Sequence, residues 1–115
     1  MDLISKILSF KDLPVGFDSY ESNPPNDVAI KNAIEAVNIF TKNNFLPDLV
    51  VASSEEGVIM EFFRIDYMYY LFEFYNDGDI IFLERGSDNK SEAEEIKIKD
   101  IEKKILKIKT GGSYA

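Results

Sequence analysis

The sequence predicts an α+β protein: an antiparallel meander of four or five strands with one helix packed on a face, a short N-terminal helix and a C-terminal helix. Three observations favour this fold. Apolar residues recur at helical spacing up to about residue 43, and from Asp48 onwards they alternate with polar ones. The predicted strands are joined by connections too short for crossover helices. About a third of the 115 residues are Leu, Ile, Val or Phe, enough for one core in a single domain spanning residues 1–115.

Two helices are predicted before the strands. Residues 2–10 form a short amphipathic helix, which ends before Pro14 because the residue ahead of a proline avoids helical geometry. Residues 26–43 form the second helix, with Asn26 or Asp27 as its N-cap. Its apolar stripe consists of Ile30, Ala33, Ile34, Val37 and either Phe40 or Thr41.

The middle of the chain predicts strands at residues 49–52, 58–63, 67–75 and 79–85. The pair Asp77-Gly78 is typical of a two-residue type I′ turn. Such a turn pairs Phe74 with Ile81 and Phe72 with Leu83.

This register divides the last hairpin into two faces. The first face is apolar and suits a helix-covered core; it holds Tyr70, Phe72, Phe74, Ile81 and Leu83. The second mixes aromatic and acidic residues; it holds Leu71, Glu73, Tyr75, Ile80, Phe82 and Glu84. Either the terminal helices cover the second face or it binds a partner. In the latter case the predicted partner-binding residues are Glu73, Tyr75, Phe82 and Glu84.

The C-terminal segment fits two interpretations. Residues 87–91 are typical of a loop, residues 95–99 alternate like a strand, and isoleucines between residues 98 and 108 have helical spacing. We expect a short strand up to Lys99 and then a helix capped by Asp100. Its lysines are expected on the solvent side, with the isoleucines packed inward.

Two motifs stand out along the chain. Residues 16–24 read Gly-Phe-Asp-Ser-Tyr-Glu-Ser-Asn-Pro ahead of a helix, and residues 56–62 read Glu-Gly-Val-Ile-Met-Glu-Phe ahead of a hairpin. The pattern resembles a family of small uncharacterised bacterial proteins, which have Trp-Asp-Ser/Gly-Tyr before a proline and a helix, and then a Gly-Ile-x-Leu-Glu-Trp strand. Phe17 and Phe62 stand where that family usually has tryptophan, and the resemblance covers about residues 10–85. It implies no established chemistry.

We interpret these motif residues as structural. Phe17 and Phe62 are expected to be core aromatics, and Asp18 to accept amide hydrogens in its turn. Glu61 is expected either to point to solvent or to accept hydrogen bonds from the loop at residues 17–20. The full set of motif residues is Phe17, Asp18, Tyr20, Pro24, Gly57, Glu61 and Phe62.

Catalysis is not expected. The chain has no His, Cys or Trp, so imidazole bases, thiol nucleophiles and the usual zinc sites are excluded. Paired carboxylates could serve a glycosidase or a divalent metal. The candidates are Asp18, Glu21, Glu61, Glu73, Asp77 and Asp79. With 21 acidic residues, however, some neighbours arise by chance, so we expect neither a metal nor a cofactor.

Charge favours a protein partner. The formal net charge is −8: residues 1–57 carry −5, residues 58–95 carry −7 and residues 96–115 carry +4. This disfavours direct nucleic-acid binding, which needs cationic side chains. We therefore expect a non-enzymatic acidic module that binds a basic protein, such as an immunity or antitoxin-like protein or an inhibitor. The alternative is a structural module that forms a homodimer or larger homo-oligomer.

The sequence favours a cytoplasmic location. Residues 1–10 lack the basic start and continuous apolar run of a signal peptide. No stretch approaches the roughly 20 apolar residues of a membrane span, so a membrane partner is not expected.

Overall fold

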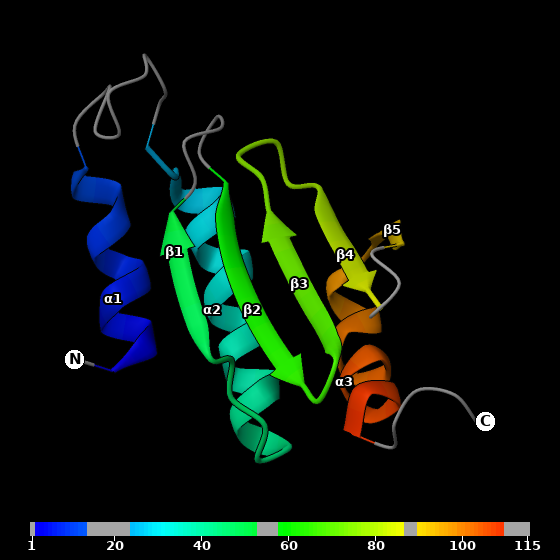
Figure 1. Cartoon of the computed structure of the whole chain (residues 1–115). Helices are drawn as coiled ribbons and strands as arrows, with labels where there is room; N and C mark the ends of the chain where they lie inside the picture. Colours follow the sequence, from blue (N-terminus) through cyan, green and yellow to red (C-terminus); the bar gives the residue numbers. More distant parts are fainter. Residues whose placement is uncertain (1, 14–23, 53–57, 87–89, 110–115) are drawn as a thin grey trace.

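The computed structural model describes residues 2–13, 24–52, 58–86 and 90–109. In these ranges it contains one antiparallel five-stranded sheet whose strand order follows the chain, β1-β2-β3-β4-β5 (Figure 1). The strands are β1 (Leu49–Ala52), β2 (Ile59–Ile65), β3 (Met68–Phe74), β4 (Ile80–Arg85) and β5 (Ser91–Ile96). The predicted α+β meander is confirmed.

In the described part of the chain three helices accompany the sheet, and α2 and α3 lie behind it in Figure 1. The helices are α1 (Leu3–Ser9), α2 (Asp27–Lys42) and α3 (Ile101–Lys109), with short 3₁₀ turns at Phe10–Asp12 and Ile98–Asp100. Asn26 caps α2, because its Oδ1 accepts a hydrogen bond of 3.1 Å from the backbone N–H of Ala29. Among the described residues, no helix has the length and apolar character needed to cross a membrane.

The core lies between the helices and one face of the sheet. The predicted stripe of α2 supplies it, except that Ile34 is only half-buried and Ala29 and Ala36 join instead. Phe40 of α2 contacts Phe63 edge to face at 4.9 Å between ring centroids, and it lies 5.5 Å from Phe72. The isoleucines of α3 complete the core; those that are fully buried are Ile101, Ile105 and Ile108.

The β3–β4 hairpin differs from the predicted one by one residue. Phe74 pairs with Ile80 and Phe72 with Phe82, so the predicted register is wrong. The N–H of Gly78 donates to the carbonyl of Tyr75 at 3.0 Å, and the N–H of Tyr75 donates to the carbonyl of Asp79 at 3.0 Å. This is the three-residue loop in which a type I turn is followed by a left-handed glycine.

The shifted register reverses the faces predicted for β4. Ile80 and Phe82 point towards the helices, whereas Ile81 and Leu83 are half-buried on the other side. The loop is also tied to the start of α2: the backbone N–H of Asn26 donates to Oδ1 of Asn76 at 2.8 Å. A contact between residues so far apart in the sequence helps select the longer loop.

Substitution of Gly78 tests this loop. Its φ is +97°, a conformation that side chains with a branched Cβ rarely adopt, and an added Cβ would lie 3.7 Å from Cγ1 of Val28. Backbone strain, rather than a clash, therefore leads us to expect Gly78→Val to lower the free energy of unfolding by about 1–2 kcal/mol. Gly78→Asn should lower the free energy of unfolding by less, because asparagine tolerates positive φ. Equal thermal stability of wild type and Gly78→Val would contradict the loop assignment.

The C-terminal segment also departs from expectation. The fifth strand begins at Ser91, which was predicted as loop, and ends at Ile96, so it stops short of Lys99. Asp100 does not cap α3 as predicted; its Oδ2 accepts from the backbone N–H of Lys97 at 3.0 Å, at the entrance to the 3₁₀ turn. The inward isoleucines and outward lysines are confirmed, although Lys104 is half-buried and pairs with Glu94 at 2.6 Å.

Candidate binding surface

Among the described residues, helices cover one face of the sheet and leave the other uncovered. This second face, here called the open face, turns towards the viewer in Figure 1. The strand register arranges its side chains in three rows that run across the strands. The middle row is Leu49, Phe62, Leu71, Leu83 and Ala93. The arginine row is Arg64, Tyr69, Arg85 and Ser91. The glutamate row is Val51, Met60, Glu73, Ile81 and Glu95.

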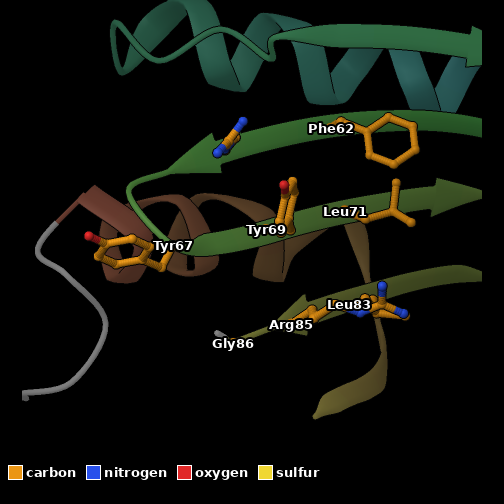
Figure 2. Close-up of a pocket in the computed structure, with 8 residues that line it drawn as sticks. Phe62, Tyr67, Tyr69, Leu71, Leu83, Arg85 and Gly86 are labelled. Carbon is orange, nitrogen blue, oxygen red and sulfur yellow. The ribbon is translucent and has the colours of Figure 1, made fainter. Parts of the chain in front are cut away.

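The middle row is apolar along its whole length. Phe62, Leu71 and Leu83 are half-buried by their neighbours, and Leu49 is 48% exposed on the edge strand. A depression of about 630 Å³ lies over this row and the arginine row. Figure 2 shows Phe62, Leu71 and Leu83 along its length, from three adjacent strands. A continuous apolar strip bordered by polar residues is typical of a contact surface.

The arginine row forms one end of the open face. The guanidinium of Arg64 lies 5.4 Å from the ring centroid of Tyr69, a cation–π contact. Nε of Arg85 donates to Oγ of Ser91 at 3.0 Å. Tyr67, in the β2–β3 turn, is 79% exposed and borders the same depression (Figure 2). This end therefore offers cationic and aromatic side chains, the types enriched at binding hot spots.

The glutamate row forms the other end. Glu73 accepts a hydrogen bond of 3.2 Å from the hydroxyl of Tyr75. Oε2 of Glu95 lies 3.9 Å from Nζ of Lys97, a long and exposed ion pair. Met60 and Ile81 are half-buried between these groups. The strand residues of the open face thus carry two arginines at one end and two glutamates at the other.

The four predicted partner-binding residues do not share a surface. Glu73 belongs to the open face, and Tyr75 bonds to it just beyond β3. Phe82 is 3% exposed, contacts Phe72 at 4.9 Å and lies under Nζ of Lys104 at 5.4 Å. Glu84 lies on the helix side as well, and the predicted co-facial arrangement is therefore wrong.

Near Glu84, the helix-covered face of the sheet is only partly buried. Burial, with the Glu84 carboxylate as a smaller cause, raises the pKa of the Tyr70 hydroxyl. The Tyr70 ring also stacks on Phe82 at 6.2 Å. This corner belongs to the rim of the core.

Three of the motif residues can be placed. Pro24 accepts a hydrogen bond of 3.2 Å from Nδ2 of Asn76, which joins the segment before α2 to the hairpin. Phe62 was expected in the core, but Phe63 takes that place and Phe62 lies on the open face. Glu61 is placed in the core. The other motif residues, Phe17, Asp18, Tyr20 and Gly57, lie outside the described residues.

Glu61 is a carboxylic acid inside an apolar core. Its residue is 0% exposed, so the first expected placement, in solvent, is wrong. The second, hydrogen bonding to the loop at residues 17–20, lies outside the described residues. It pairs with Val50 and Phe72 across the sheet, both of them buried. Neither carboxyl oxygen has a hydrogen-bond partner among the described residues. Burial raises its pKa well above the ordinary value of 4.5, because desolvation disfavours the charged form.

The carboxylates considered for catalysis do not converge. Glu61 is in the core, Glu73 is on the open face, and Asp77 and Asp79 are in the hairpin loop, where Oδ1 of Asp77 accepts from the N–H of Asp79 at 2.9 Å. Asp18 and Glu21 lie outside the described residues. Within the described part of the chain, no three acidic side chains gather in a metal-binding group.

Sequence reasoning missed most of the open face. Arg64, Tyr69 and Arg85 were not singled out, and Leu83 was assigned to the core. A three-residue loop places Leu83 and Arg85 on the same face as Leu71, but Asp77-Gly78 fits a two-residue loop equally well.

Comparison with protein-family models, curated proteins and solved structures found no match. The resemblance to the bacterial family described above stays a prediction.

Proposed function

We propose that this chain is a non-enzymatic protein-binding module that makes its contact through the open face. The proposal depends on the apolar middle row, which lies between an arginine row and a glutamate row and which the described helices leave uncovered. Protein interfaces combine such an apolar centre with a polar rim and are enriched in tyrosine and arginine. The absence of histidine and cysteine, together with the dispersed carboxylates, supports a role in binding rather than catalysis.

The charges of the open face balance, so the acidity of the protein belongs to the rest of its surface. A net charge of −8 speeds the approach of a basic partner through long-range attraction. An immunity or antitoxin-like protein, or an inhibitor of a basic effector, is the form of this proposal that the charge favours. The open face would then supply the area that is desolvated on binding.

Leu83→Asp tests the contact surface. It places a charge within the apolar middle row, next to Leu71, and we expect it to abolish capture of the protein that the wild-type chain retains from a lysate of the source cells. Once purified, that protein should bind Leu83→Asp at least roughly a hundredfold more weakly, the effect of a buried unpaired charge. Isothermal titration calorimetry measures the difference.

Leu106→Asp is the matched control, because Leu106 is 50% exposed on α3, away from the open face. It should bind like wild type. Tyr69→Ala is a second open-face variant at a side chain that is 46% exposed, so its effect does not depend on folding. Unchanged affinity of both Tyr69→Ala and a folded Leu83→Asp would refute the proposed surface.

A further inference from the structure

The open face is complementary to itself in both charge and apolar character. The arginine row and the glutamate row lie at opposite ends of the strands, with the apolar middle row between them. We propose that the occupant of the open face is a second copy of this chain, in a two-fold sheet-on-sheet dimer. This rests on the proposed function, because it assigns a partner to the same surface. That partner is a second acidic chain, in place of the basic effector that the net charge favours.

Charge selects one of the two simple two-fold arrangements. A two-fold axis parallel to the strands would stack arginine row on arginine row. An axis parallel to the rows, at the level of Leu71, instead reverses the strand direction and stacks each arginine row on the other copy's glutamate row. A contact of this kind is isologous, so each complementary pair is made twice.

The register specifies which groups meet in the second arrangement. Glu73 and Tyr69 belong to the same strand, so Glu73 of one copy is brought over Tyr69 of the other. Tyr69 pairs with Arg64 on one side and with Arg85 on the other, which places the incoming carboxylate between two guanidiniums. Arginine is well suited to binding carboxylates.

The middle rows supply the apolar contact. Leu71 of the central strand faces its symmetry mate, and Phe62 and Leu83 extend the contact over the neighbouring strands. Face-to-face sheets cross at about 30°, which keeps the contact at the centre of the sheet in place while displacing the edges. The net charge of −8 per chain opposes association over long distances, but physiological salt screens exposed charges beyond about 8 Å.

Charge exchange tests the dimer. Arg64→Glu/Arg85→Glu makes both ends of the open face acidic, and Glu73→Arg/Glu95→Arg makes both ends basic. Sedimentation velocity over a dilution series, in about 0.15 M salt, should give a wild-type dimer. Each charge variant alone should dimerise roughly tenfold or more weakly. An equimolar mixture of the two should recover a heterodimer, which native mass spectrometry identifies by its mass.

Lys31→Glu/Lys103→Glu is the control, because it changes the net charge as much as the double arginine variant at exposed helix positions. It should dimerise like wild type. A monomeric wild type, or charge variants that dimerise normally, would overturn the proposed dimer. A monomer whose capture of another protein is lost in Leu83→Asp would leave the proposed function standing with a different partner. A monomer whose capture is insensitive to Leu83→Asp would overturn both.

Discussion

Phe82→Ala is expected to lower the free energy of unfolding by about 3–5 kcal/mol, the usual cost of removing a fully buried phenylalanine. Phe82 is 3% exposed and contacts the rings of Phe72 and Tyr70. Leu83→Ala, one residue further along, should cost only about 1 kcal/mol because its side chain is half-buried on the open face. Urea unfolding followed by circular dichroism measures both losses.

The two-residue turn expected from Asp77-Gly78 would make Leu83 the core residue. In that case Leu83→Ala would lower the free energy of unfolding more than Phe82→Ala does. A second pair on the same strand repeats the comparison: Ile80→Ala should be costly and Ile81→Ala mild, since Ile80 is 2% exposed. Greater losses for Leu83→Ala and Ile81→Ala would show that the observed register is wrong.

The sequence predicted the positions of the first four strands, and local turn chemistry could not settle the exact register. Asp77-Gly78 favours a glycine at positive φ in both the two-residue and the three-residue loop, so the dipeptide does not distinguish them. The hydrogen bonds that Asn76 makes with Asn26 and Pro24 span about fifty residues of sequence. A long-range contact of this kind has no local signal.

The alternation within β2 was equally ambiguous. One phase holds Ile59, Glu61 and Phe63, and the other holds Met60, Phe62 and Arg64. Each phase contains one charged residue, so hydrophobic periodicity does not decide which one faces the helices. Phe63 packs against Phe40 and Phe45, which places the first set of residues on the helix-covered face. Glu61 belongs to this set and is therefore buried with Phe63. The open face and the buried carboxyl therefore have a common origin.

Glu61→Met should make the protein more stable at neutral pH. In the wild type, folding removes the carboxyl from water without providing a hydrogen-bond partner among the described residues. An unsatisfied buried polar group costs about 1–3 kcal/mol, and an ionised one costs more. Methionine fills a similar volume with apolar atoms and adapts to irregular space. We therefore expect the free energy of unfolding to rise by at least about 1–3 kcal/mol.

The dependence of this gain on pH identifies its cause. Between the ordinary pKa of 4.5 and the raised pKa of the folded state, the folded protein binds one more proton at Glu61 than the unfolded chain does. The wild type therefore loses stability as the pH rises through this window, by up to about 1.4 kcal/mol per pH unit, and the loss levels off above the folded pKa. Below the window the carboxyl is protonated in both the folded and the unfolded state. The stability difference between Glu61→Met and wild type then reflects only hydrogen bonding and packing.

Comparing variant with wild type isolates this group from the other carboxylates. Glu102, for example, accepts a hydrogen bond from Nδ2 of Asn43 and lies 3.5 Å from Nζ of Lys42, and these contacts lower its pKa. The contribution of Glu102 to stability is lost as the pH falls, whereas the loss at Glu61 occurs as the pH rises. Because Glu102 is present in both proteins, its contribution cancels in the comparison. Urea unfolding of both proteins at several pH values from 4.5 upward gives the difference.

Two further variants sharpen the result. Glu61→Gln cannot ionise, so its stability relative to wild type should rise with pH as that of Glu61→Met does, although its amide leaves it less stable than methionine. Glu92→Gln removes an exposed carboxylate from β5; it is the matched control and should not reproduce the gain in stability at neutral pH. A gain from Glu61→Met that stays constant from pH 4.5 into the alkaline range would mean that Glu61 ionises in the folded protein as readily as in the unfolded chain. Its carboxyl would then have a compensating partner or access to water.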